Sequence, residues 1–288
     1  MKASFALVAV GLLACGTPAR SSQPFDTPPH PQIAKPLVPF SITFVANEGV
    51  LIQAGTQKIL IDGLHRFYGE AYAVLPDDER AVAELAGVPF DAITTIVATH
   101  VHGDHFSADA VAAHLSYNKA RPRFYGPPQV VEALKPKTSV SVHSQIQVVP
   151  WVVGDSHRFH ERGVDIELLG LRHTYPEKHQ DVENLGVLIR VAGITILHVG
   201  DADATHENFA PFSLPDLEID FALLPTWFIG SEKARQVVAD SIAPKRVIVF
   251  HLDPRSKQLA SRLRAVMPSV LAGTNMMQRW SWDELSRF

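Results

Sequence analysis

Short apolar runs interrupted by turn residues recur along this chain from residue 41 to residue 250. Three early runs, residues 41–46, 50–54 and 58–61, are separated by Asn-Glu-Gly and Gly-Thr turns, which predicts a meander of hairpin strands. Residues 92–98 form a β-branched apolar run, which predicts a buried strand. Further strands are predicted at residues 164–171, 185–191, 195–199, 221–224 and 247–250.

Two helical patterns alternate with these strands. Ser107 is suited to cap a helix over residues 108–115, and a second helical pattern lies near residues 232–242. Strands that alternate with helices are typical of a layered α/β domain. Polar residues follow several predicted strands directly, where such folds usually assemble their sites. These residues are Asp62, residues 99–105, His173, Asp201 and His251.

The first 39 residues have a different character. Residues 5–14 form a short apolar segment after Lys2, and Leu12-Leu13-Ala14-Cys15 resembles the lipobox of bacterial lipoproteins, whose cysteine is lipidated. The alternative is an ordinary secretory signal with an incidental cysteine. Residues 16–39 are rich in proline, serine and threonine, as in an extended tether. We expect a signal peptide at residues 1–15, a linker at 16–39 and one catalytic domain at 40–288.

This reading predicts an exported protein of the cell envelope. Acyl chains on Cys15 would anchor it, and Gly16 after the cysteine resembles the sorting signal for the outer membrane, with the domain in the periplasm. We find no apolar run of about 20 residues that would form a transmembrane helix. Cys15 is the single cysteine, which excludes a disulfide within the chain.

Length and charge narrow the function. The sequence has 288 residues, 46% of them hydrophobic, which is sufficient for one substantial core. A net charge of −4 with no strongly basic segment argues against a nucleic-acid partner and favours a small-molecule substrate. Fourteen histidines are many for a chain of this length and make a metal site worth looking for. The sequence does not indicate the oligomeric state.

The segment His100-Val101-His102-Gly103-Asp104-His105 is the sharpest chemical signal. Imidazole nitrogens with a carboxylate and no thiolate suit a borderline divalent ion. In an extended segment, residues two apart point the same way, so His100 and His102 can share one ion. Asp104 and His105 follow Gly103, which we expect to supply a tight turn that directs them toward a second ion.

This segment, together with Thr99 and the preceding strand, resembles the histidine motif of the metallo-β-lactamase superfamily. Four further segments resemble the family's other motifs and occur in the family's order. They are Ile59-Leu60-Ile61-Asp62-Gly63, Leu171-Arg172-His173, His198-Val199-Gly200-Asp201 and Val247-Ile248-Val249-Phe250-His251. The resemblance therefore covers most of the predicted domain.

The resemblance implies an αββα sandwich, an α/β fold of two mixed β-sheets flanked by helices. It also implies two metal ions, zinc by preference, with manganese or iron as alternatives. His100, His102 and His173 would bind one ion; Asp104, His105 and His251 would bind the other. Asp201 would bridge the ions, and Asp62 would orient the histidine loop.

Several other residues are candidates for subsidiary roles. We prefer His173 to His179 as the third-motif ligand because His173 ends a strand; His179 then either faces the substrate or is exposed to solvent. Trp227 and Phe228 either wall the substrate cleft or pack in the core. Arg66, Tyr68 and Tyr72 are candidates for a second wall. His198 lies within a strand and is interpreted as a hydrogen-bonded core residue.

The predicted function is hydrolysis of an ester, lactone, amide-like or phosphodiester bond by a metal-bound hydroxide, with Asp104 and Asp201 as the catalytic carboxylates. Within the superfamily, the chain looks most like the ascorbate-6-phosphate lactonase branch. One alternative is a non-catalytic envelope lipoprotein that binds metal. Seven potential ligands argue against that alternative, because a structural site normally closes with four. A redox di-iron protein is a third hypothesis, which His102 disfavours because that branch usually carries a glutamate there.

Overall fold

The computed structural model describes residues 32–256 and 258–288. The predicted signal peptide, Cys15 and most of the predicted linker lie outside the described residues. The end of the predicted linker contacts the domain, because Ile33 packs against buried core residues and the Leu37 N–H donates to the Ala192 carbonyl (3.3 Å). The first strand begins at Phe40.

The first sheet of the described chain is a seven-stranded mixed sheet with the strand order β14-β1-β2-β3-β4-β5-β6. Strands β1 to β3 form an antiparallel meander, and β3 to β6 run parallel to one another. The strands are β1 (Phe40–Phe44), β2 (Val50–Ala54), β3 (Gln57–Ile61), β4 (Thr95–Val97), β5 (Arg123–Gly126), β6 (Ile146–Val148) and β14 (Gln278–Ser281).

The second sheet has the order β13-β12-β11-β10-β9-β8-β7 and is also mixed. Strands β10 to β13 are parallel, whereas β7 to β10 pair antiparallel. Its strands are β7 (Ser156–Glu161), β8 (Val164–Arg172), β9 (Glu183–Val191), β10 (Ile194–His198), β11 (Phe221–Pro225), β12 (Arg246–Phe250) and β13 (Leu271–Ala272).

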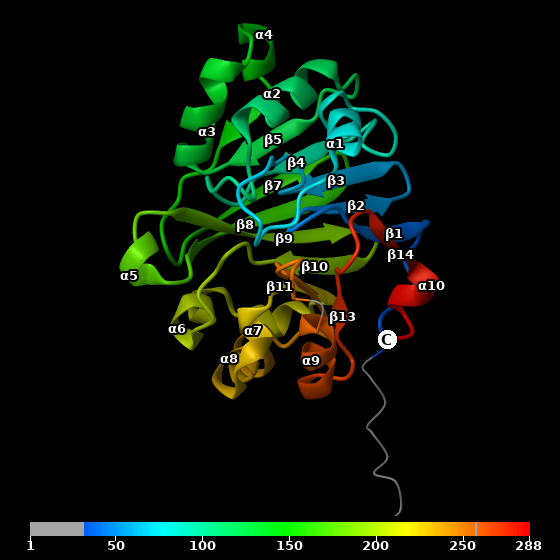
Figure 1. Cartoon of the computed structure of the whole chain (residues 1–288), viewed down its shortest axis with the longest axis vertical. Coiled ribbons are helices and arrows are strands. Elements are labelled where there is room, and N and C mark those ends of the chain that lie inside the picture. Colours follow the sequence, from blue (N-terminus) through cyan, green and yellow to red (C-terminus); the bar gives the residue numbers. More distant parts are fainter. Residues whose placement is uncertain (1–31, 257) are drawn as a thin grey trace, which may run out of the picture. The chain divides into compact units, whose positions relative to one another are not determined.

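Helices cover the outer face of each sheet (Figure 1). The first sheet carries α1 (Asp77–Glu84), α2 (Ala108–Tyr117), α3 (Pro128–Leu134) and α4 (Val140–His143), and the second carries α6 (His206–Phe209), α7 (Trp227–Gly230), α8 (Glu232–Val237) and α9 (Leu259–Val266). Short turns complete the chain: α5 (Pro176–His179), α10 (Trp282–Leu285), the 3-10 segments η1 (Lys135–Lys137), η2 (Ala210–Phe212) and η3 (Leu214–Leu217), and the π-helical turn η4 (Val238–Ile242).

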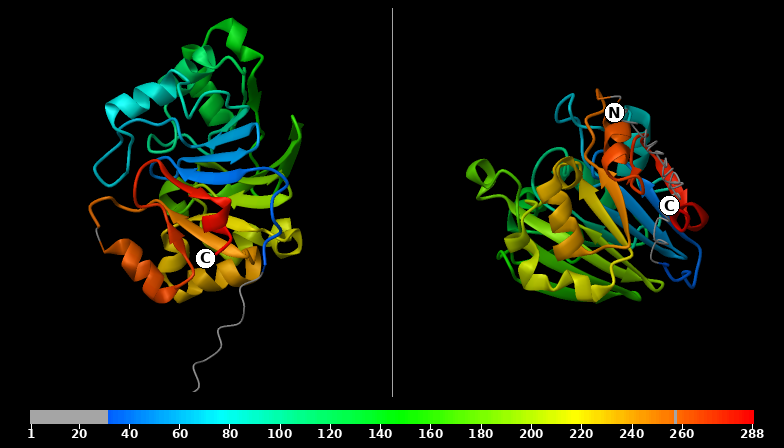
Figure 2. Two further views of the ribbon diagram at one scale, coloured as in Figure 1. Left: turned by 90° about the vertical axis from the view of Figure 1, so that its right-hand side faces the viewer. Right: turned by 90° about the horizontal axis from the view of Figure 1, so that it is seen from below.

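Three apolar layers hold this αββα arrangement together, and Figure 2 shows the stacked sheets from two further directions. In β2, Val50 and Ile52 face the layer between the sheets, whereas Leu51 faces the helices. In β12, Ile248 faces the same layer between the sheets, whereas Val249 faces the helices that cover the second sheet. Since both faces of these strands are covered, their sequences read as continuous apolar runs. The predicted fold is confirmed.

Most predicted element boundaries agree with the structure, and one strand is shorter than predicted. β4 pairs only from Thr95, because Ala92 takes a left-handed conformation (φ 52°) and turns the chain before the strand begins. Ser107 caps α2 as predicted, accepting a hydrogen bond from the Ala110 N–H. Among the described residues, no helix combines the length and the apolar character that a membrane span requires.

Candidate metal centre

The predicted ligands come from the ends of strands in both sheets. The loop with His100, His102, Asp104 and His105 follows β4. His173 directly follows β8, Asp201 comes three residues after β10, and His251 directly follows β12. Two backbone hydrogen bonds join these loops across the sandwich: Leu185 N–H to the Thr99 carbonyl (2.9 Å) and His251 N–H to the Asn47 carbonyl (3.0 Å).

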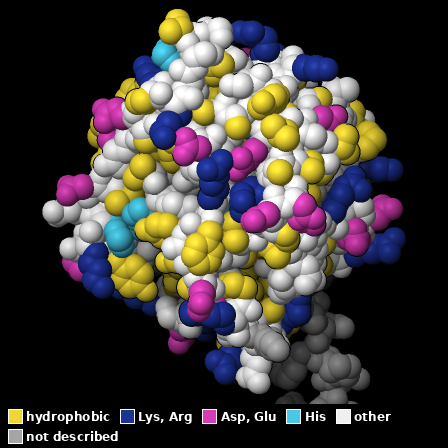
Figure 3. Space-filling view, turned by 45° about the horizontal axis from the view of Figure 1, so that its top comes forward, with side chains coloured by type: hydrophobic (Ala, Val, Ile, Leu, Met, Phe, Trp, Pro, Cys, Tyr) yellow, Lys and Arg dark blue, Asp and Glu magenta, His cyan; other side chains and the backbone are white. Residues whose placement is uncertain are grey.

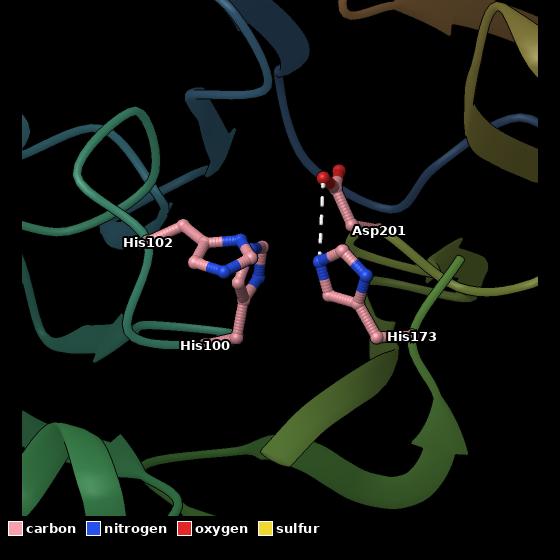
Figure 4. A group of neighbouring side chains, drawn as sticks. All are labelled: His100, His102, His173 and Asp201. Atoms are coloured by element: carbon pink, nitrogen blue, oxygen red, sulfur yellow. Dashed lines mark hydrogen bonds and ion pairs between the residues drawn. The ribbon is translucent and has the colours of Figure 1, made fainter. Parts of the chain in front are cut away.

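Four of these side chains form a first group. Each of His100, His102, His173 and Asp201 offers a ligand atom that lies within 4.8 Å of the others. The side chains point toward one another, His100 and His102 from one loop and His173 and Asp201 from two others (Figure 4). His100 Nε2 lies 3.1 Å from His102 Nδ1, and His173 Nε2 lies 3.6 Å from Asp201 Oδ2. The group can therefore surround one cation.

Asp104, His105 and His251 form a second group, of three side chains, whose ligand atoms also lie within 4.8 Å of one another. Asp104 Oδ2 lies 3.3 Å from His251 Nε2 and 3.5 Å from His105 Nε2. The other carboxylate oxygen of Asp201, Oδ1, lies 3.3 Å from His105 Nε2 and 3.7 Å from His251 Nε2. Asp201 thus directs one oxygen toward each group.

Four of the ligand atoms in the cluster have no hydrogen-bond partner among the described residues. Nε2 of His105, His173 and His251 and Oδ1 of Asp201 are all buried in this state. Burying polar atoms without partners costs free energy, so native proteins normally satisfy them. Nitrogen and oxygen donors at these distances suit zinc, manganese or iron. The residues present therefore fit a pair of divalent ions.

Burial and neighbouring charges shift the pKa values of several members of the cluster. Burial alone would raise the pKa of Asp104, but His105 and His251 together hold that pKa well below its usual range. The pKa of Asp201 is lowered in the same way, against its burial, by the same two histidines. Burial, reinforced by a neighbouring histidine, lowers the pKa of His102 to about 4. Ionised carboxylates and a neutral imidazole are the forms that bind a cation.

Asp62 orients the histidine loop (residues 99–105) through contacts with Thr99 and His105. Its Oδ1 accepts a hydrogen bond from the Thr99 N–H (2.8 Å), and its Oδ2 accepts one from the Thr99 hydroxyl (2.6 Å). The same Oδ2 lies 2.9 Å from His105 Nδ1, which leaves Nε2 of that ring facing the cluster. Similarly, His173 Nδ1 lies 2.7 Å from the Thr174 carbonyl, which leaves Nε2 of His173 free.

Asn47 belongs to this site, although the sequence analysis assigned it only to a turn. Its side-chain NH₂ group donates to the backbone carbonyl of Asp104 and to Asp104 Oδ2, both at 3.1 Å. Its backbone carbonyl accepts a hydrogen bond from the His251 N–H. The residue is buried and left-handed (φ 51°), a conformation that asparagine tolerates well. Asn47 therefore ties together two members of the second group. The Asn-Glu-Gly signature is also an ordinary turn, so the sequence gives no distinct signal for this role.

We expect Asn47→Ala to weaken metal binding by the group of Asp104, His105 and His251 more than metal binding by the first group. Alanine removes both contacts to Asp104, and losing a partner that holds a metal ligand typically costs about 10–100-fold in metal affinity. Metal titration by calorimetry should show one tight and one weakened site. Asn47→Asp keeps the turn geometry but replaces a donor with an acceptor, and should weaken the same site at least as much. Equal affinity at both sites in either variant would contradict the assignment.

The chain turns at Gly103 as expected, because the His105 and Phe106 N–H groups both donate to the His102 carbonyl (3.1 and 2.9 Å). The glycine itself is required by packing and not by its backbone conformation. It is not among the left-handed glycines of the chain. A Cβ at residue 103 would instead come within 2.5 Å of the Tyr68 ring, which stacks over the histidine loop. Tyr68 in turn contacts Tyr72, with ring centroids 5.4 Å apart. Gly103 therefore lets the segment 64–76 cover one side of the site.

We expect Gly103→Ala to displace Tyr68 while the cluster keeps its metal content. The added methyl overlaps an aromatic ring that is half exposed and free to move aside, so the effect falls on substrate contacts. KM should rise about tenfold, consistent with the loss of one aromatic contact, while kcat changes little. Ser107→Gly on the same loop is a matched backbone control. Loss of bound metal in Gly103→Ala would show instead that the loop itself had shifted.

Trp227 and His179 lie beside the cluster, whereas Phe228 does not. The Trp227 ring lies 5.2 Å from the His251 ring, and the His179 ring lies 4.8 Å from that of His173. Phe228 is fully buried against Phe209, so of the two alternatives for this residue the core-packing one holds and the cleft-wall one does not. Adjacent residues of a helical turn point to different sides, and here only the tryptophan faces the site.

Three other expectations are resolved by local contacts. His198 is a core residue as interpreted, with Nε2 3.0 Å from the Glu48 carbonyl. Arg66 forms a two-pronged ion pair with Glu84 and does not form a wall of the site. Tyr72 does form one, because its ring lies 5.6 Å from His251. On the face shown in Figure 3, histidine side chains reach the surface beside hydrophobic ones.

Comparison with known proteins identifies related sequences and folds. A family model described as the beta-lactamase superfamily domain matches residues 58–273, three quarters of the chain. No curated protein sequence matches this chain.

Solved structures match the fold at low sequence identity. The metallo-β-lactamase fold protein YhfI from Bacillus subtilis has a TM-score of 0.56 at 16% identity, covering 84% of this chain and 99% of that one. The short form of human tRNase Z has a TM-score of 0.55 at 13% identity, covering 84% of this chain and 98% of that one. Isothiocyanate hydrolase from Delia radicum gut bacteria gives 0.51 at 14%, covering 84% and 99%. Such distant likenesses establish the fold alone.

Proposed function

This chain belongs to the metallo-β-lactamase superfamily, and on that premise we propose that it is a dinuclear metal-dependent hydrolase of a small-molecule substrate. The bond cleaved would be an ester, lactone, amide-like or phosphodiester bond. One observation carries the proposal: Asp201 presents Oδ2 to His173 and Oδ1 to His105 and His251. A carboxylate between two groups of ligands suits a pair of ions better than a single structural ion.

The chain's own residues would share the chemistry as follows. His100, His102 and His173 would hold one ion, Asp104, His105 and His251 the other, and Asp201 both. Bound zinc, manganese or iron supplies Lewis acidity, which makes a water molecule nucleophilic at neutral pH and polarises the bond under attack. Asp104, ionised and held by Asn47, is placed to accept a hydrogen bond from the attacking water. Trp227 and Tyr72 flank His251 and would exclude bulk water from that side.

A closer relationship to the ascorbate-6-phosphate lactonase branch is part of this proposal. It is supported by Gly200-Asp201, by Leu223-Leu224-Pro225 and by the Asn184-Leu185-Gly186 turn. Asn184 holds the proposed bridging residue, because its Oδ1 accepts from the Asp201 N–H (3.0 Å) while its amide donates to the Val199 carbonyl (3.1 Å).

The test is a substrate panel combined with metal analysis. The purified protein should contain two ions per chain and hydrolyse at least one of a set of chromogenic esters, lactones and bis-phosphodiesters. His102→Ala should lose this activity. Two bound ions with no hydrolysis of any substrate would favour the non-catalytic metal-binding alternative. Equal rates in the wild type and His102→Ala would contradict the assigned site.

Localisation in the cell envelope is a separate proposal. It rests on the lipobox-like segment around Cys15, which lies outside the described residues. Radiolabelled palmitate should label the wild-type protein in bacterial cells, and Cys15→Ser should abolish the label and release the protein from the membrane fraction. Unchanged membrane association of Cys15→Ser would contradict lipid anchoring.

A further inference from the structure

A cavity of about 560 Å³ lies beyond the segment 64–76. Phe44, Ala73, Pro76, Leu252 and Met276 supply most of its apolar wall. Its volume falls in the range of about 300–1,000 Å³ that is usual for small-molecule sites. The cavity is therefore large enough for a substantial part of a small ligand.

Two separate chain segments connect this cavity with the metal centre. Leu252 immediately follows His251, one of the proposed ligands. Ala73 immediately follows Tyr72, whose ring lies edge-on to the His251 ring at 5.6 Å. The cavity wall therefore begins one residue away from the site on each segment.

The described lining residues disfavour an anionic occupant. Their only charged side chains are acidic, Glu79 and Asp253. Asp253 is held by Arg255 in a two-pronged ion pair, at 2.7 and 2.9 Å, which satisfies both partners at the cavity rim. A phosphate or carboxylate in the cavity would meet Glu79 and an Asp253 carboxylate that is already paired with Arg255, and no lysine, arginine or histidine among the described lining residues. An uncharged apolar group would bury its surface against the aliphatic and aromatic wall.

We propose that this cavity binds an uncharged apolar group of the substrate, a medium-length alkyl or acyl chain or an aryl group. The inference rests on the proposed hydrolase function and specifies its substrate class. The substrate is then an ester, lactone or amide in which one side of the scissile group is hydrophobic. On this proposal a group attached to the scissile bond passes Tyr72, whose ring contacts His251, to reach the cavity, so Tyr72 acts as a specificity-determining residue.

Two chain-length series test the proposal in the metal-loaded protein. The first measures kcat/KM for 4-nitrophenyl esters from acetate to octanoate. The second measures the binding of non-hydrolysed n-alkyl amides, from butanamide to octanamide, by calorimetry. Both kcat/KM and affinity should rise about fourfold for each methylene group that enters an apolar site.

Two variants should remove this dependence and one should keep it. Ala73→Phe narrows the cavity by placing a bulky ring in it, and Met276→Asp places a charge on its wall at a residue that is 42% exposed. Val140→Asp makes the same kind of change on exposed α4, outside the cavity lining, and is the matched control. Metal content and the rate with acetate should stay unchanged in all three.

The outcomes separate this inference from the proposed function. Hydrolysis without any chain-length dependence would overturn the cavity assignment and leave the hydrolase proposal intact. Amide binding that strengthens with chain length and weakens in Ala73→Phe and Met276→Asp would support the cavity even if no ester is hydrolysed. Faster hydrolysis of phosphate- or carboxylate-bearing esters than of their neutral analogues would also overturn it.

Discussion

Asp201→Asn should reduce kcat/KM by at least about 10³-fold, because it removes the group placed to hold two ions together. Asparagine has nearly the same size and keeps one carbonyl oxygen. Its NH₂ group cannot bind a cation, so either His173 or His105 and His251 lose their shared carboxylate partner. Metal content measured by mass spectrometry should fall from two ions per chain to one or fewer.

Asp203→Asn is the matched control for this experiment. Asp203 lies two residues further along the same loop, is not a member of the ligand groups, and has Arg172 as a charged neighbour. It should keep both ions and most of the activity. Two ions and near-wild-type kcat/KM in Asp201→Asn would show that this carboxylate is not the bridge.

The layers of the fold were predictable because burial leaves a plain trace in the sequence. Strands such as β2 and β12 are covered on both faces, and their unbroken apolar runs give their positions nearly to the residue. Pairings between distant segments leave no such trace. β14 pairs with β1 in register, Ile42 opposite Trp280, across more than 230 residues, and nothing local specifies that partner.

The residues of the site were likewise only partly predictable from the sequence. Histidines and aspartates at strand ends were visible because their residue types are uncommon there, and the structure brings seven of them together. The role of Asn47 could not be predicted, because its two contacts to Asp104 depend on how the end of β1 approaches the histidine loop. Gly103 was singled out for the wrong reason, since the tyrosine that needs its missing side chain lies 35 residues earlier.

Adjacent aromatic residues mark another limit of sequence reasoning. Trp227 and Phe228 occupy one short helical turn, and their order alone does not say which faces the cleft. Hydrogen bonding decides it here: the Trp227 indole N–H donates to the Ala202 carbonyl (3.0 Å), next to the proposed bridging residue. Phe228 has no polar group to satisfy and fills the core.

Asp62→Ala should be the most destabilising substitution at this site. The change leaves the Thr99 N–H, the Thr99 hydroxyl and His105 Nδ1 without their buried acceptor. Breaking a buried hydrogen-bonded charge network of this kind costs about 3–5 kcal/mol. For a domain of this size each kcal/mol lowers Tm by roughly 2–4 °C. We therefore expect a fall in Tm of roughly 10 °C, measured by calorimetry, and a matching fall in the urea midpoint.

Asp62→Asn separates the loss of hydrogen bonds from backbone strain. Asp62 is left-handed (φ 48°), and asparagine adopts that conformation as readily as aspartate does, whereas alanine adopts it at a higher energetic cost. Asparagine also keeps one acceptor for the Thr99 N–H but turns an NH₂ group toward either the Thr99 hydroxyl or His105. Its Tm should therefore fall between those of the wild type and Asp62→Ala, with a clear loss of metal affinity, because His105 Nδ1 no longer has a charged acceptor to hold the ring. If Asp62→Asn binds both ions as tightly as the wild type, Asp62 stabilises the loop without orienting the ligand.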